Sequence, residues 1–172
     1  MEKDLNNLSL LGYAEPNGEL FAVAGMSRPE GTWFSVAVDS GACENVANPE
    51  DVPDYMVTEP EASKNGRDFV SATGEVIPNL GELKLPAVTA ENTVRGMTFS
   101  AAPVTKPLGS VKRICAAGHV VVFDEDGSYI INKNTGELNM LREEAGNYML
   151  DLWIPPASDT RFSTAASFRR HP

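Results

Sequence analysis

The stretch Phe34-Ser35-Val36-Ala37-Val38-Asp39-Ser40-Gly41-Ala42 runs from an apolar segment directly into an Asp-Ser-Gly turn. Aromatic and β-branched residues favour strands, whereas Asp, Ser and Gly favour turns. The stretch therefore predicts a buried strand over residues 33–38 with Asp39 at its end. An ordinary strand-ending turn has the same composition, so the tripeptide alone leaves that interpretation open.

Short apolar runs separated by turn residues continue along the rest of the chain. The 172 residues include 14 glycines and 12 prolines, a pattern typical of β-sandwiches and β-barrels. The predicted elements are a strand at 20–23, hairpins at 69–77, 83–99 and 120–131, a polar loop at 47–66, and either strands or a short helix at 138–152.

The apolar spacing changes to that of a helix after the second hairpin. Val111, Ile114 and Cys115 would share one helical face, which predicts a short helix over residues 110–117. Gly118 follows where a helix C-terminal cap belongs. Trp33 and Trp153 are expected to anchor the core or an interface.

Composition narrows the class of function. Hydrophobic residues make up 42% of the chain, which suits one domain with a modest core. A net charge of −10 opposes direct binding to nucleic acid or to an anionic membrane surface. The sequence contains no apolar run near the ~20 residues that cross a bilayer, and its start lacks a signal peptide pattern. We therefore expect no membrane partner and a cytoplasmic location.

The cysteines and histidines predict no metal or other cofactor. Cys43 and Cys115 are the only cysteines, too few for a disulfide framework, so free thiols in a reducing compartment are expected. Cys43 is expected to be a small buried hydrophobe rather than a redox control point. His119 and His171 are the only histidines, so His119 is expected to be a surface or half-buried structural residue.

Asp39 is the candidate catalytic residue. The buried strand would deliver its carboxylate into a low-dielectric cleft, Gly41 would permit a close backbone turn, and Ser40 could hydrogen-bond to a partner loop. Two such carboxylates cannot both ionise when they lie together, so they share a proton. One can then activate water while the other polarises a peptide carbonyl. Because the chain has one such tripeptide, an identical second copy would supply the second carboxylate.

Four segments, in order, resemble the protease region of Copia-type retrotransposon polyproteins, over roughly residues 30–153. The first resembles the catalytic loop and the second the flap. The third resembles the last core strand and the helix, glycine and strand that follow it, and the fourth the segment between protease and integrase. In this sequence they are residues 38–42, residues 72–82, residues 106–114 with 118–123, and residues 127–130 with 135–136 and 146–150.

The resemblance implies a mostly β fold, a small closed retropepsin-like (acid-protease) barrel with one short helix. It implies an aspartic endopeptidase that acts as a homodimer on an extended peptide or polyprotein. Asp39 would be catalytic, and Ser40, Gly41 and Ala42 would form the active-site loop. The flap and substrate-binding residues would be Ala72, Thr73, Gly74, Ile77, Asn79, Leu80 and Gly81.

The local sequence patterns and the resemblance together divide the chain into four parts. They are an N-terminal strand or arm at 1–24, the protease domain at 25–118, a β-hairpin C-terminal extension at 119–156 and a disordered tail at 157–172.

Two features depart from the family. Leu108-Gly109 stands where a bulky apolar pair is usual, and Gly109 is expected to weaken strand packing. The expected flap tip at residues 79–81 has few glycines. An alternative is therefore a catalytically inactive retropepsin-like module for dimerisation or peptide binding. A third possibility is a structural polyprotein linker in which the Asp-Ser-Gly is a coincidence.

Overall fold

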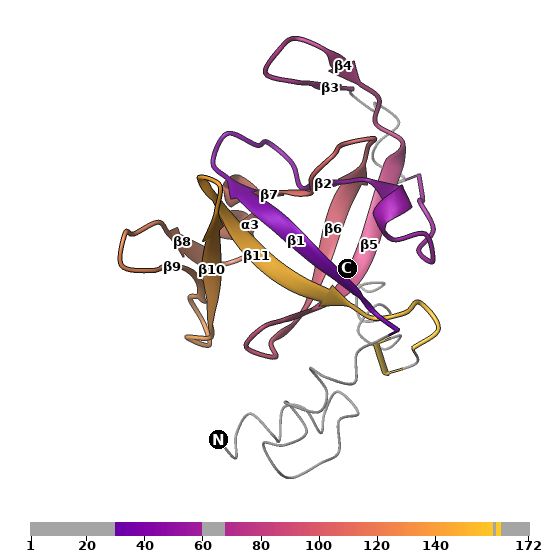
Figure 1. Ribbon diagram of the computed structural model, residues 1–172. Coiled ribbons are helices and arrows are strands. Elements are labelled where there is room, and N and C mark those ends of the chain that lie inside the picture. The colour runs from indigo at the N-terminus through magenta and orange to yellow at the C-terminus, as the bar shows by residue number, and fades with distance from the viewer. Residues whose placement is uncertain (1–29, 60–67, 160, 163–172) are drawn as a thin grey trace.

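The computed structural model describes residues 30–59, 68–159 and 161–162, which are mostly β-strand with the short helix α3 (Figure 1). The predicted strand at 20–23, the arm at 1–24 and most of the tail lie outside these residues. The elements are β1 (Thr32–Asp39), β2 (Val46–Ala47), the 3-10 turn η1 (Pro49–Asp51), β3 (Phe69–Val70), β4 (Val76–Ile77), β5 (Gly81–Thr89), β6 (Val94–Ala101), β7 (Leu108–Ser110), α3 (Val111–Ala116), β8 (His119–Val122), β9 (Ser128–Asn132), β10 (Leu138–Glu144) and β11 (Asn147–Ile154).

Nine of these strands form one sheet in the order β1-β7-β2-β6-β5-β11-β10-β9-β8, and β1 also pairs with β11. β3 and β4 form a separate hairpin. β1 therefore has hydrogen-bonded neighbours on both edges, parallel β7 on one and antiparallel β11 on the other. A strand whose two edges are both paired exposes no backbone ladder to solvent, and this central place agrees with its apolar sequence.

The core lies between β1 and β11 on one side and β5 and β6 on the other (Figure 1). Phe34 of β1 meets Phe99 of β6 edge to face, with ring centroids 5.7 Å apart. Full burial of one such side chain stabilises a fold by about 1.5–3 kcal/mol. Trp153 is buried, as expected, whereas Trp33 is 54% exposed and lies outside the core.

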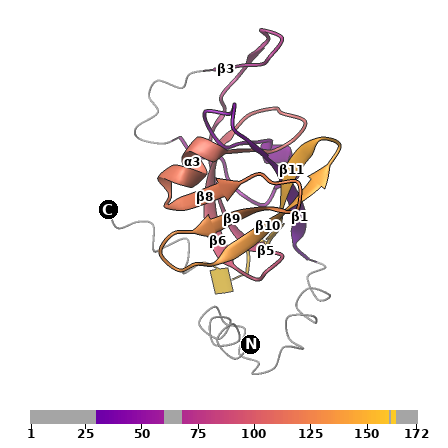
Figure 2. The same cartoon turned by 90° about the vertical axis from the view of Figure 1, so that its left-hand side faces the viewer.

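The local predictions are largely confirmed. Hairpins form at β3–β4, β5–β6 and β8–β9, and the helix predicted over residues 110–117 is α3, which lies beside β8 (Figure 2). Gly118 and Gly127 have φ angles of 89° and 148°, values that glycine adopts without strain. Residues 138–152, whose sequence is compatible with either strands or a short helix, lie in the strands β10 and β11 and the turn between them.

Gly109 has a different role from the one expected. β7 runs parallel to β1, with Val38 opposite Gly109 and Asp39 opposite Ser110. A Cβ atom at Gly109 would lie 2.9 Å from Val36 Cγ1, closer than real contacts allow. The expectation of weakened packing is thus wrong, because the missing side chain lets β7 approach β1.

The C-terminal strands share a sheet with the predicted protease region. β11 pairs with β1 from Thr32↔Ile154 to Ala37↔Met149, and it pairs with β5 through Leu152↔Thr89. The boundary expected at residues 118 and 119 therefore does not separate two sheets.

A polar cluster joins three strands around Asp151. Ser35 Oγ donates to Asp151 Oδ1 at 2.5 Å, and the Arg142 guanidinium donates to both carboxylate oxygens at 2.8 and 3.0 Å. The hydrogen bonds from Arg142, with help from Ser35, lower the pKa of Asp151 from its usual value. The cluster links β1, β10 and β11.

Removing the Asp151 charge should make the free energy of unfolding less dependent on pH at acidic pH. A carboxyl whose folded-state pKa is lowered contributes stability above its unfolded pKa of about 3.9, and loses it as pH falls through the folded value. Asp151→Asn should therefore lose less free energy of unfolding than the wild type between pH 7 and pH 3, measured by urea denaturation. Glu144→Gln, a substitution at another acidic group beside Arg142, is the control. Equal slopes for wild type and Asp151→Asn would contradict the assignment.

The contact between Gly109 and Val36 predicts a coupled pair of substitutions. Gly109→Ala should lower the free energy of unfolding by about 1–3 kcal/mol, the usual cost of overpacking a core. In a Val36→Ala background, the colliding methyl group is absent and most of that cost should disappear. Additive effects in the double-mutant cycle would show that the two residues do not collide.

Candidate active site

Asp39 ends β1 and is exposed in the single chain, although Val36, Ala37 and Val38 before it are buried. The expected delivery of its carboxylate into a low-dielectric cleft is therefore not found in one chain. The physical reason is that the apolar part of the strand stops at Val38, and Asp39 begins a surface turn. Asp39 does not line the cavity between β6 and β11 or the small cavity beside η1, both formed by described residues.

The Asp-Ser-Gly turn folds back on its own carboxylate. The backbone N–H of Gly41 donates to Asp39 Oδ1 at 2.7 Å. A Cβ atom at Gly41 would lie 3.3 Å from the same oxygen, a tight contact that glycine avoids. Ser40 is exposed, and Ala42 is half-buried.

A buried serine that the sequence interpretation did not select holds this loop. Ser110, at the end of β7, is fully buried, and its hydroxyl donates to the Ala42 carbonyl at 2.7 Å. Ser110 Oγ also accepts a hydrogen bond from the Arg113 N–H at 3.3 Å and so caps the N-terminus of α3. The Ser110 N–H donates to Asn45 Oδ1 at 2.8 Å. The loop after Asp39 is thus tied to β7 at two points.

An ion pair adds a third tie. Arg113 of α3 donates through Nε to Glu44 Oε2 at 2.8 Å, and its Nη2 contacts Glu44 Oε1. The hydrogen bond that Arg113 donates to Glu44 raises the pKa of Arg113 above its usual value. Both side chains are partly exposed, so the pair orients the loop more than it stabilises the fold.

The predicted flap is a hairpin that projects from the sheet on the same side of the molecule as the loop after Asp39 (Figures 1 and 2). Its tip is formed by Ala72, Thr73 and Gly74, and Gly74 has a φ of 83°. The Gly74 N–H donates to the Ser71 carbonyl at 2.9 Å, and the Ser71 N–H donates to the Glu75 carbonyl at 2.9 Å. The predicted turn position is therefore confirmed.

The two faces of the hairpin differ. Val70 pairs with Val76, and these side chains are 68% and 62% exposed. Phe69 pairs with Ile77 on the other face, and both are half-buried. An exposed pair of valines on a projecting hairpin can contact an apolar ligand or a second copy.

Residues 79–81, expected at the flap tip, lie instead at its base. The Gly81 N–H donates to Asn79 Oδ1 at 3.0 Å, and the Leu80 N–H donates to the Ala101 carbonyl at 2.7 Å. A Cβ atom at Gly81 would lie 2.7 Å from the Thr58 carbonyl oxygen. Gly81 is thus a packing residue at the start of β5, and the tip assignment was wrong by about seven residues because the turn centres on Thr73-Gly74.

Other predicted residues have simpler outcomes. Cys43 and Cys115 are free and exposed, so the buried environment expected for Cys43 is wrong: the residue lies in the surface connection between β1 and β2. His119 is half-buried, as expected.

Within the described residues, no group of three or more acidic, histidine or cysteine side chains could hold a metal ion. In the same residues, no helix combines the length and the apolar character needed to cross a bilayer.

The chain was compared with models of known protein families, with curated protein sequences and with solved structures, and none of them matches it. The residues around Asp39 therefore provide the basis for a functional proposal.

Ser110→Ala should destabilise the fold and loosen the Asp39 loop. The substitution removes one donor and one acceptor from a buried site, which costs about 1–3 kcal/mol. Urea denaturation should show that loss, and amide hydrogen exchange should accelerate at residues 41–45. Ser40→Ala is the matched control, because Ser40 is exposed and its loss should change stability by less than about 0.5 kcal/mol. Unchanged exchange in Ser110→Ala would refute the bracing role.

Proposed function

We propose that the chain is one half of a homodimeric aspartic endopeptidase, with Asp39 from each copy forming the catalytic pair. The observation that supports this best is the arrangement around Asp39. Its exposed carboxylate stands at the end of a buried strand, in a turn fixed by Gly41 and by the buried Ser110. A fixed backbone beneath an exposed acid suits a site that a second copy completes.

The strand pairing also supports a retropepsin-like barrel. Hydrogen-bonded neighbours lead from β1 through β7, β2, β6, β5 and β11, and β11 pairs with β1 again. A sheet that closes through such pairings would have few open edges, as in small β-barrels. In such a barrel, the parallel pairing of β1 with β7 would place the C-terminal ends of the two strands, Asp39 and Ser110, side by side.

The proposed chemistry needs two carboxylates that share one proton. The ionised Asp39 takes a proton from a water molecule as the water oxygen bonds to the peptide carbonyl carbon. The protonated Asp39 of the second copy donates to the carbonyl oxygen. Collapse of the tetrahedral intermediate breaks the C–N bond, and a proton passes to the leaving nitrogen.

The β3–β4 hairpin would cover an extended peptide substrate. An extended chain can hydrogen-bond along a strand edge, which is a common mode of peptide recognition. Val70 and Val76 would then face apolar side chains of the peptide or of the second copy. This same exposed pair also supports the alternative function, a catalytically inactive module that binds peptides or dimerises.

Peptide cleavage should depend on Asp39 and on a second copy. We expect the purified chain to cleave a diverse peptide mixture between about pH 4 and pH 7, the range that suits a shared proton, with products identified by mass spectrometry. Asp39→Asn should reduce cleavage by at least ~1,000-fold, because each copy loses its Asp39 carboxylate and the dimer then has neither member of the catalytic pair. Asp126→Asn, at an exposed turn between β8 and β9, should leave it unchanged.

Mixing the two forms separates a dimeric site from a monomeric one. Increasing amounts of Asp39→Asn chain, added to a fixed amount of wild type, should lower cleavage as mixed dimers replace active ones. Activity that is insensitive to the added variant would refute the shared site. Peptide binding without cleavage, in a sample that is dimeric by light scattering, would instead favour the binding module.

A further inference from the structure

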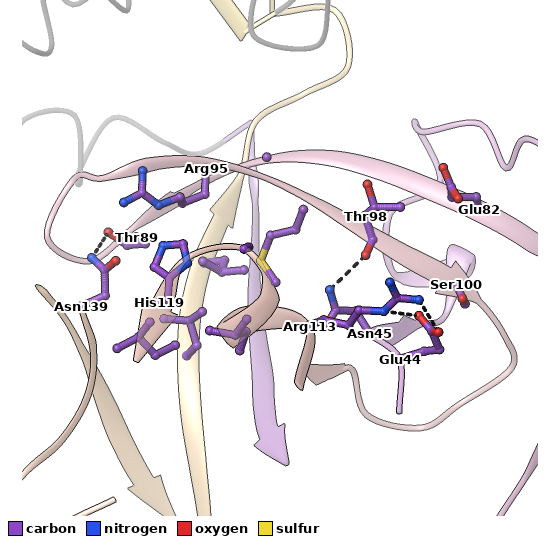
Figure 3. A pocket seen from close by; sticks show the side chains of 17 residues that line it. Glu44, Asn45, Glu82, Thr89, Arg95, Thr98, Ser100, Arg113, His119 and Asn139 are labelled. Carbon is purple, nitrogen blue, oxygen red and sulfur yellow. Dashed lines mark hydrogen bonds and ion pairs between the residues drawn. The ribbon is translucent and has the colours of Figure 1, made fainter. Parts of the chain in front are cut away.

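A cavity of about 340 Å³ lies between the β5–β6 hairpin and the part of the chain formed by α3, β8, β9, β10 and β11 (Figure 3). Asp39, Ser40 and Gly41 do not line it. Its volume falls within the range of about 300–1,000 Å³ that small-molecule sites occupy. The cavity is formed within one chain, so it needs no second copy.

Part of the cavity lining is apolar. It includes Met97 of β6, Ile114 of α3, Ile130 of β9, and Leu150 and Leu152 of β11. Ile130, Leu150 and Leu152 are at most 7% exposed, so their positions are fixed by the core. A rigid apolar wall of this kind favours a compact apolar body.

A histidine that lines one end of the cavity has an unused hydrogen-bonding atom. His119 Nδ1 is buried and has no hydrogen-bond partner among the described residues. Its neighbours at this end are engaged: Arg95 donates to Glu137 Oε2 at 2.7 Å, and Asn139 Nδ2 donates to Thr89 Oγ1 at 3.0 Å. Figure 3 shows Arg95, His119 and Asn139 together at this end. A buried polar atom without a partner costs free energy, which a ligand could recover.

The charges around the cavity are already compensated. Arg113 pairs with Glu44, Arg95 pairs with Glu137, and Glu82 pairs with Lys84. The four charged side chains in the lining, two acidic and two basic, sum to zero. A charged ligand would lose its hydration without gaining an uncompensated partner. The cavity therefore favours a neutral ligand.

We propose that this cavity binds a small neutral molecule with a compact apolar body and one hydroxyl or amide group. The apolar body lies against Met97, Ile130 and Leu150, and the polar group hydrogen-bonds to His119 Nδ1. The site does not include the Asp39 carboxylate, although Glu44, Asn45 and Arg113, which hold the loop after Asp39, also line the cavity.

Two matched probes test the proposal on the full chain. 2-Naphthol has a hydroxyl group on a neutral apolar body, and naphthalene has the same body without it. Titration followed by probe fluorescence should show 2-naphthol binding about 2- to 12-fold tighter than naphthalene, which corresponds to one net hydrogen bond. 2-Naphthoate, an anion of the same shape, should bind no better than naphthalene. Amide NMR shifts should change at residues 96–98, 119 and 130 and not at residues 39–42.

Three variants locate the interaction. His119→Phe should remove the preference for 2-naphthol, so that both probes bind alike. Val120→Phe is the control, because it introduces the same side chain at the next position of β8, which does not line the cavity, and the preference should remain. Thr98→Trp, at an exposed position of β6 that lines the cavity, should fill it and abolish binding of both probes.

Several results would overturn the proposal. These are the absence of 2-naphthol binding to the wild type, equal affinity for the two neutral probes, and a preference that survives His119→Phe. NMR shifts confined to residues outside the cavity would also overturn it, whether or not the variants fold.

Discussion

The close parallel contact between β1 and β7 is the constraint on which the candidate active site depends. It is possible because Gly109 has no side chain to collide with Val36. The approach places Ser110 beside Asp39 in the register, where its buried hydroxyl reaches the Ala42 carbonyl. The position of the loop after Asp39 therefore depends on a glycine and a serine about 70 residues away in the sequence.

The other edge of β1 depends on the C-terminal part of the chain. β11 covers that edge along six residue pairs, and Asp151 of β11 joins Ser35 to Arg142. An uncovered edge would expose backbone donors and acceptors. Residues 147–154 thus complete the sheet on which Asp39 is carried, so the environment of β1 depends on β11 as well as on β7.

The two proposed sites differ in the kind of partner that each would bind. Asp39 and the exposed valines of the β3–β4 hairpin lie at the surface, where a second copy or an extended peptide can reach them. The cavity beside His119 is partly open to solvent and has balanced charge, which suits a small neutral molecule. Glu44 and Asn45 belong to the loop after Asp39 and also line the cavity, so the two places are neighbours.

The sequence by itself determined the elements whose signals are local. Turn residues at short spacing located the hairpins at Thr73-Gly74 and at residues 124–127, an apolar run located β1, and a helical period located α3. Tertiary structure alone decided which strands pair with β1, that Asp39 is exposed, and that Ser110, Asn45 and Glu44 fix its loop. Those bonds join residues 65 to 69 positions apart. No local pattern encodes such distances, because they arise only when strands pair.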